Sequence, residues 1–127
     1  MPTVSSSVLV DSSGWLEYLT GDSNASLFEP YLARELVLLV PTIVIYEVRK
    51  VLLLRQKKHA ADAFLAEALA RAIVPCDENI AVLAVDLALQ HRLSVADAIV
   101  YATAQSREAQ VVTSDAHFSG LPGVTLI

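Results

Sequence analysis

Short apolar runs alternate along the chain with longer stretches in which apolar residues recur at helical spacing. Alternation of this kind predicts strands joined by crossover helices, and therefore a mainly parallel sheet with helices on both faces. The near-continuous apolar run LVLLV at residues 36–40 is typical of a strand buried on both faces. We therefore expect an α/β fold, a three-layer α/β/α sandwich. The predicted strands are Ser7–Val10, Leu36–Val40, Ala72–Val74, Gln110–Thr113 and Val124–Ile127, and the clearest predicted helices are Thr42–Lys58, His59–Arg71, Asp77–His91 and Ser94–Arg107.

Polar residues mark several helix starts. Thr42 and Ser94 each precede a helical stretch and are predicted N-caps. One of the three residues at 11–13 can cap a further helix, which a second short helix would follow. The large apolar residues of these two short helices exceed what one inner stripe needs. They are Trp15, Leu16, Leu19, Leu27, Phe28, Tyr31 and Leu32.

The composition fits a folded domain. Of the 127 residues, 54% are hydrophobic and 18% charged, and a chain of this length can bury a core of its own, so we expect residues 1–127 to form one domain. The single cysteine, Cys76, cannot close an intrachain disulfide, which fits a reducing compartment. The N-terminus lacks a basic signal-peptide region, and the most apolar stretch, residues 36–46, falls far short of the ~20 residues of a membrane span. We therefore expect a cytoplasmic protein without a membrane segment.

The formal net charge of −5 argues against a nucleic-acid partner. The distribution of charge weakens this argument, because five of the nine Lys and Arg residues lie between Arg49 and Lys58, where no acid occurs. A local basic face can therefore coexist with an acidic whole. The competing interpretation of this stretch is an ordinary solvated helix flank.

Four carboxylates stand where parallel α/β sheets carry their ligand sites, near the carboxyl ends of strands. Asp11 directly follows the first predicted strand, and Asp115 comes two residues after the fourth. Glu47 lies one turn into the helix after the second strand, and Asp97 lies in the first turn of the helix that opens at Ser94. Such a fold can bring all four acids to one edge of the sheet.

Gathered carboxylates repel one another, and desolvation adds to the cost of their charges. A divalent cation removes this repulsion, and Mg²⁺ and Mn²⁺ prefer oxygen ligands while leaving positions open for water and phosphate. Such a centre suits hydrolysis of a phosphodiester without any side-chain nucleophile. We therefore predict a metal-dependent hydrolytic centre formed by Asp11, Glu47, Asp97 and Asp115.

Each acid also has an ordinary structural explanation. Asp11 can be an N-cap, Asp97 a first-turn acid favoured by the helix dipole, and Asp115 the cap of a short turn that follows it. Glu47 is hardest to explain in this way, because its neighbours along the helix face are apolar, although Lys50 at i+3 can pair with it.

Other reactive side chains do not form a recognisable centre. Cys76 and the histidines lack zinc-binding spacing, and we expect His59, His91 and His117 at the surface or at caps. Phosphoryl transfer through an aspartyl-phosphate would need a lysine near a late strand, and no lysine follows Lys58. This second enzyme class is therefore excluded.

Four segments of the chain resemble the PIN-domain nucleases, and among them the VapC-type toxins of toxin–antitoxin pairs. VLVDSSGW resembles the family's first strand with its first metal-binding acid, here Asp11. PTIVIYEV resembles the second motif, with Glu47, and LSVADAIVYATA the third, with Asp97. VVTSDAHF resembles the last motif, with Thr113 supporting the site and Asp115 as the fourth acid. The four segments span nearly the whole chain in the family's order.

The resemblance implies a five-stranded parallel sheet of order 3-2-1-4-5. It also implies Mg²⁺ or Mn²⁺ as cofactor, RNA as substrate, an antitoxin that covers the active site as partner, and a homodimer. Ser12 and Ser13 match a position whose hydroxyl supports the first acid, and the sequence leaves open which of them does so. We predict an endoribonuclease of this kind. The alternative is a PIN-like fold kept as a non-catalytic binding module.

Two further predictions concern the surfaces that contact RNA and an antitoxin. On one helix running through Glu47, Lys50 and Lys58 would share the side of that acid, whereas Arg49 would point elsewhere. Lys50 and Lys58 are therefore our candidates for contacts with RNA phosphates. We also expect part of the apolar surface at residues 15–32 to contact an antitoxin helix, with a basic side chain of the partner reaching the acids.

Overall fold

The computed structural model describes residues 7–33 and 36–127. Its sheet has five parallel strands in the order β3-β2-β1-β4-β5, so the predicted order 3-2-1-4-5 and the predicted α/β class are confirmed. The central strand β1 pairs on both sides, with Leu9 opposite Leu39 of β2 and Val111 of β4. The strands are β1 (Ser7–Val10), β2 (Val37–Pro41), β3 (Ala72–Val74), β4 (Gln110–Thr113) and β5 (Val124–Leu126).

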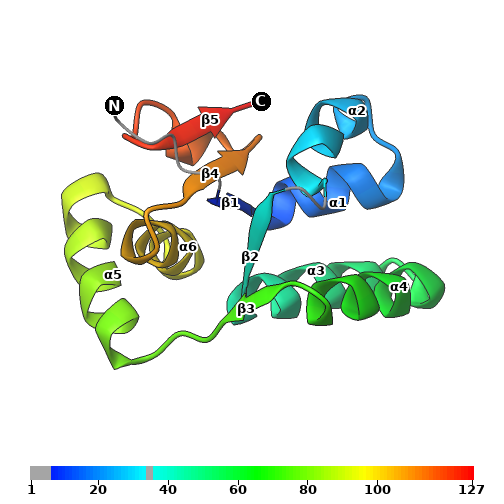
Figure 1. Cartoon of the computed structure of the whole chain (residues 1–127), viewed down its shortest axis with the longest axis horizontal. Helices are drawn as coiled ribbons and strands as arrows, with labels where there is room; N and C mark the ends of the chain where they lie inside the picture. Colours follow the sequence, from blue (N-terminus) through cyan, green and yellow to red (C-terminus); the bar gives the residue numbers. More distant parts are fainter. Residues whose placement is uncertain (1–6, 34–35) are drawn as a thin grey trace.

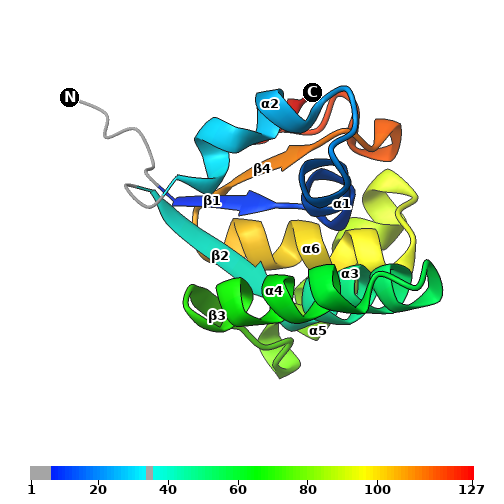
Figure 2. The same ribbon diagram turned by 90° about the vertical axis from the view of Figure 1, so that its right-hand side faces the viewer.

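Helices cover both faces of this sheet. Figure 1 shows α5 and α6 on one side of the strands and α1 to α4 on the other, which gives the expected three layers. Figure 2 shows α1 beginning at the end of β1. The helices are α1 (Ser12–Thr20), α2 (Ala25–Phe28), α3 (Thr42–Leu54), α4 (Lys58–Leu69), α5 (Glu78–His91) and α6 (Val95–Ser106), with short 3₁₀ helices η1 (Glu29–Leu32) and η2 (Ala116–Phe118).

The core lies between the sheet and both helical layers. Leu9 and Val10 of β1 and Val40 of β2 are completely buried, as expected for strands covered on both faces. Trp15 of α1 packs edge-on against Phe64 of α4, with 5.1 Å between ring centroids. This contact packs α1 against α4.

One predicted helix boundary is wrong, and it matters for the site. The helix beginning at Thr42 does not run through Lys58, because α3 ends at Leu54 and Lys58 starts α4. Gln56 takes a left-handed conformation with φ 59°, and the Lys57 amide donates to the Leu52 carbonyl at 2.8 Å. This hydrogen-bonding pattern closes a helix and reverses the chain. The two lysines proposed for RNA therefore lie on different helices.

The predicted helix starts have different outcomes. Ser94 is an N-cap, as predicted, and its Oγ accepts a hydrogen bond from the Asp97 amide at 3.3 Å. Thr42 is the first helical residue of α3 and does not cap it, because Pro41 occupies the N-cap position. Asp97 therefore lies in the first turn of α6, as the sequence indicated.

The segment from Trp15 to Leu32 is more buried than expected. Of its seven large apolar side chains, only Leu27 is exposed, with 53% of its surface accessible. The others are buried or pack partly buried against the core. The reason is that α1, α2 and η1 fold against one another and against the sheet. In residues 7–33 and 36–127, no helix combines the length and apolar character needed to cross a membrane.

Candidate functional site

Asp11 lies at the carboxyl end of β1, where its carboxylate is almost completely buried at 4% exposure. Its Oδ2 accepts hydrogen bonds from Thr113 Oγ1 at 2.9 Å and Ser13 Oγ at 3.2 Å. Although Asp11 occupies the N-cap position of α1, its side chain makes no capping hydrogen bond. The capping explanation thus accounts for the position of Asp11 and not for the direction of its carboxylate.

The two serines that follow Asp11 have separate partners. Ser13 Oγ bonds to Asp11 and lies 3.2 Å from Thr113 Oγ1, whereas Ser12 Oγ donates to Glu47 Oε1 at 2.7 Å. Thr113 is fully buried, and its Oγ1 also accepts from the Asp115 amide at 2.9 Å. The start of α1 and the end of β4 are therefore joined by hydroxyl groups that bond to the carboxylates of Asp11 and Glu47 and to the backbone of Asp115.

Glu47 reaches the site from α3. Its partner is the Ser12 hydroxyl, and among the described residues no ion pair joins it to Lys50. Lys50 instead places its Nζ 5.5 Å from the centroid of the Tyr46 ring. The acid on an otherwise apolar helix face is thus stabilised by a hydrogen bond from another element.

Asp97 and Asp115 approach each other from α6 and from the loop after β4. Asp115 Oδ1 accepts from the His117 amide at 2.9 Å, so Asp115 does cap η2, as one interpretation of the sequence proposed. His117 Nδ1 lies 2.9 Å from Asp115 Oδ1 and 3.9 Å from Asp97 Oδ2. One ligand atom from each of these three residues lies within 4.8 Å of the other two.

A cavity of about 460 Å³ connects most of these groups. It is lined by Glu47, Arg92, Ser94, Ala96, Asp97, Asp115 and His117. Asp11 does not line the cavity, but the negative charge of Asp11 contributes to the raised pKa of Asp97. The structure thus brings acids from β1, α3, α6 and the β4–η2 loop to one edge of the sheet.

The pKa values of Asp97 and Asp11 are both raised, because burial and the neighbouring carboxylates disfavour their charged forms. Burial, together with the neighbouring charges of Asp115 and Asp11, raises the pKa of Asp97 to about 6. Burial also raises the pKa of Asp11, with the charge of Glu47 adding to it and the hydrogen bonds from Thr113 and Ser13 opposing it. Keeping these groups ionised therefore destabilises the folded protein unless a cation neutralises them.

The donor set fits a hard divalent cation. Carboxylate oxygens with open neighbouring space are the ligands that Mg²⁺ and Mn²⁺ prefer. Asp97 and Asp115 retain side-chain exposures of 15% and 27%, so an ion can reach both from the cavity. The residues present therefore match the cofactor that the resemblance implies.

Two residues that line the cavity, His117 and Arg92, were not predicted from the sequence. His117 is 81% exposed, as expected for a surface residue, yet its ring lies beside the carboxylates of Asp97 and Asp115. Its position two residues after Asp115, at the start of a short turn, was the available signal. Arg92 had no signal in the sequence, because only the packing of α5 against α6 places it beside the acids.

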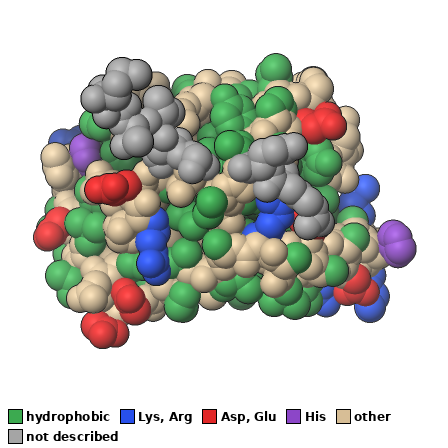
Figure 3. All heavy atoms as spheres, viewed as in Figure 1, with side chains coloured by type: hydrophobic (Ala, Val, Ile, Leu, Met, Phe, Trp, Pro, Cys, Tyr) green, Lys and Arg blue, Asp and Glu red, His purple; other side chains and the backbone are tan. Residues whose placement is uncertain are grey.

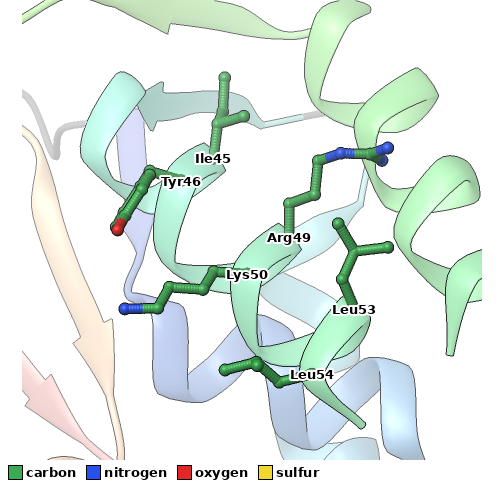
Figure 4. Close-up of a pocket in the computed structure, with 6 residues that line it drawn as sticks. All are labelled: Ile45, Tyr46, Arg49, Lys50, Leu53 and Leu54. Carbon is green, nitrogen blue, oxygen red and sulfur yellow. The ribbon is translucent and has the colours of Figure 1, made fainter. Parts of the chain in front are cut away.

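The basic residues are placed differently from the sequence prediction. Figure 3 shows Lys and Arg side chains gathered at the end of the molecule where α3 and α4 meet. Lys58 Nζ is ion-paired with Asp62 Oδ2 at 2.8 Å, and Arg49 contacts the same carboxylate at 3.1 Å. Figure 4 shows that Lys50 and Arg49 extend in different directions from α3, as the helical spacing predicted.

Comparison with known proteins identifies a matching family and solved structures of similar fold. A family model described as PIN domain matches residues 8–124. The chain is similar in fold to a toxin–antitoxin complex from Klebsiella pneumoniae (TM-score 0.79, 23% identity, 93% of this chain and 95% of that chain). It is also similar to VapC20 from Mycobacterium tuberculosis, described as a sarcin–ricin loop cleaving toxin (TM-score 0.75, 21% identity, 92% and 96%).

A third similar structure is VapBC2 from Rickettsia felis bound to a DNA fragment from its promoter (TM-score 0.73, 16% identity, 95% of this chain and 97% of that chain). None of the curated proteins compared with the sequence matches it. The family model covers most of the chain, and the similar structures share its fold over nearly their whole length. The chain therefore belongs to the PIN domain family.

Proposed function

We propose that this protein is a metal-dependent endoribonuclease of the VapC type, acting in the cytoplasm as the toxin of a toxin–antitoxin pair. The observation that carries the proposal is a solvent-open cavity lined by Glu47, Asp97 and Asp115, with the buried Asp11 near enough for its charge to raise the pKa of Asp97. Membership of the PIN domain family supports it, as does the similarity in fold to toxins, one of which is described as a sarcin–ricin loop cleaving toxin.

Each residue has a definite part in this proposal. Asp97 and Asp115 would hold Mg²⁺ or Mn²⁺ at the cavity, with Glu47 and Asp11 completing the negative site. Bound there, the ion supplies an activated water and neutralises charge on the phosphate. The Ser12 hydroxyl orients Glu47, while Ser13 and Thr113 orient Asp11. No side chain is assigned as a separate general base.

The first experiment separates an enzyme from a binding module. Purified protein is incubated with transfer, ribosomal and messenger RNA in Mn²⁺, in Mg²⁺ or in EDTA. We expect discrete cleavage products with either cation and none in EDTA, because the acids cannot activate water without an ion. RNA binding without cleavage in all three conditions would favour the non-catalytic alternative.

The proposed RNA contacts of Lys50 and Lys58 have unequal support. Lys50 is exposed on the same helix as Glu47, one turn further along, and among the described residues it has no carboxylate partner. Lys58 belongs to α4, and its amino group is ion-paired with Asp62. We therefore propose Lys50 as the principal lysine that contacts RNA phosphates. A phosphate contact of Lys58 would have to replace its ion pair with Asp62.

An antitoxin has a suitable place beside α1. A hollow of about 490 Å³ lies between α1, η1 and α4, with Trp15, Tyr18 and Phe64 among its walls. The acid Glu29 also lines it, whereas Glu67 there is ion-paired with Arg71. Apolar walls beside an acid suit an amphipathic segment that carries a basic residue. We propose that an antitoxin helix occupies this hollow and that a basic side chain of the partner extends to the acid cluster.

A homodimer would cover apolar surface elsewhere. On α3, Tyr46, Leu53 and Leu54 are exposed around an apolar hollow of about 470 Å³, shown in Figure 4. We call this surface the α3 patch. A second apolar surface, on α5 and the start of α6, consists of Val82, Val85, Leu89 and Val95. Contiguous apolar surfaces of this kind usually mark interfaces, and we propose that a second copy of the chain covers the apolar side chains of the α3 patch while the amino group of Lys50, which also lines this hollow, stays available to RNA.

Replacing Leu54 by Glu should disrupt the homodimer. Leu54 is 73% exposed, so the charge leaves the monomer fold intact while it places a carboxylate in an apolar interface. We expect light scattering to give about twice 13.7 kDa for the wild-type protein and a mass near 13.7 kDa for the variant. Leu27→Glu, at the exposed residue of α2, is the control and should stay dimeric. A monomeric wild-type protein would contradict the proposal.

A further inference from the structure

Arg92 occupies a backbone position that ordinarily favours glycine. It ends α5 in the left-handed conformation, with φ 58° and ψ 45°, and the next amide, that of Leu93, donates to the Ala88 carbonyl at 3.2 Å. At the equivalent position after α1 the chain uses Gly21, with φ 70°. A side chain with a Cβ is strained in this conformation, whereas glycine is not. The local backbone therefore gives no reason for an arginine at this position.

The position of Arg92 in the tertiary structure gives a reason. Arg92 lines the same cavity as Glu47, Asp97 and Asp115, and the residue is exposed to solvent. Even so, within residues 7–33 and 36–127 the guanidinium forms no ion pair with any of these acids. Glu47 bonds to Ser12, and Asp115 contacts His117, so both acids have other partners. The cation at the wall of this acidic cavity is therefore available to an external anion.

The anion that this arrangement fits is a phosphodiester. Four acids at one edge of the sheet repel an approaching RNA chain, so the substrate needs a fixed positive group next to them. A guanidinium presents paired N–H donors that match two phosphate oxygens, and it stays charged at every physiological pH. Since Arg92 sits at a helix end that is tied down by backbone hydrogen bonds, its Cα is held in place relative to the acids.

We propose that Arg92 binds a backbone phosphate of single-stranded RNA at the wall of the acidic cavity. The contact is a substrate-binding one, and it rests on the proposed ribonuclease function. It reads no base, so it contributes to affinity for any RNA sequence and positions the chain beside the acids. Glycine at residue 92 would relieve the left-handed strain and would also remove the guanidinium.

The test measures binding separately from cleavage. A fluorescein-labelled 20-nucleotide RNA of mixed sequence is titrated with protein in Ca²⁺ at several KCl concentrations, and a gel verifies that the RNA stays intact. We expect Arg92→Gln to weaken binding roughly tenfold at low salt, as for the loss of one charged hydrogen-bonded pair. The slope of log K against log salt should fall by about 0.7, the value for one phosphate contact to a single strand.

Matched variants separate this role from a structural one. Arg107→Gln removes another exposed arginine at a helix end, about 15 Å along α6 from Asp97, and should leave affinity and slope unchanged. Arg92→Gly should raise Tm by about 2–4 °C while it weakens RNA binding as strongly as Arg92→Gln. Gln56→Gly relieves the same left-handed conformation and should raise Tm without any change in RNA binding.

The outcomes are distinct. If the wild-type protein cleaves RNA in Mn²⁺ but Arg92→Gln keeps the wild-type affinity and salt slope, the Arg92 proposal is wrong and the ribonuclease proposal stands. If the wild-type protein neither binds nor cleaves any of the RNAs, both proposals fail. An equal loss of slope in Arg107→Gln would also overturn the assignment, because the contact would then belong to the overall charge and not to the cavity.

Discussion

Asp97→Asn is expected to reduce RNA cleavage at least about 100-fold and, at the same time, to stabilise the metal-free protein by roughly 1 kcal/mol. Changes to residues that only orient metal ligands commonly cost 10–100-fold, so loss of a proposed ligand should cost no less. The stability gain arises because the substitution removes a charge that burial and the neighbouring acids disfavour. RNA cleavage in Mn²⁺ and thermal unfolding in EDTA measure the two effects.

Two further variants make this prediction specific. Asp11→Asn should also abolish cleavage, but with a smaller gain in stability, because the native carboxylate accepts hydrogen bonds from Thr113 and Ser13. Asp86→Asn removes an exposed acid of α5 and should change neither cleavage nor stability. Full cleavage activity in Asp97→Asn would remove Asp97 from the proposed centre, whatever its effect on stability.

The metal-free protein is expected to be more stable at pH 5 than at pH 7, by roughly 1–2 kcal/mol from Asp97. In the folded state the pKa of Asp97 is about 6, above its ordinary value of 3.8. As the pH falls from 7 through about 6, the folded protein takes up a proton that the unfolded chain does not yet bind. Stability therefore rises over this interval and stops rising near 3.8. The raised pKa of Asp11 acts in the same direction.

Saturating Mn²⁺ should reverse this order. The cation binds the ionised acids and competes with protons, so the rise in Tm on adding Mn²⁺ should be larger at pH 7.5 than at pH 5. Thermal unfolding at both pH values, with EDTA or Mn²⁺, measures the effect. In Asp97→Asn most of the pH 5 advantage should disappear. If this variant keeps the wild-type pH dependence, another group is responsible and the electrostatic description of the cavity is wrong.

The stability and RNA-binding predictions share a physical origin. Carboxylates that are buried and repel one another attract a cation, but they also repel the phosphates of RNA. A group such as Arg92, fixed beside the acids yet unpaired with them among the described residues, compensates for the second property. The net charge of −5 thus argues less strongly against an RNA substrate than the sequence suggested.

Local patterns in the sequence were sufficient for the strands and for the positions of the acids along the chain. Apolar runs flanked by polar residues predicted β1, β3 and β4 with their observed bounds. In β1 and β4 three of the four residues are buried, as expected for strands covered on both faces, whereas β3 at the edge of the sheet is mostly exposed. The cap at Ser94 was equally visible, since its hydrogen bond joins residues three positions apart. Parallel connection of the strands then follows from the helices between them.

Only the tertiary structure decided how the acids are held and which cations stand near them. Ser12 bonds to Glu47, 35 residues away, and Thr113 bonds to Asp11, 102 residues away, so no local pattern distinguishes the roles of Ser12 and Ser13. The end of α3 depends on the left-handed conformation of Gln56, and a glutamine in the sequence does not predict that conformation. Arg92 reaches the cavity because α5 packs on α6. Hydrogen bonds and charges act through space, and sequence periodicity reports only on neighbours along the chain.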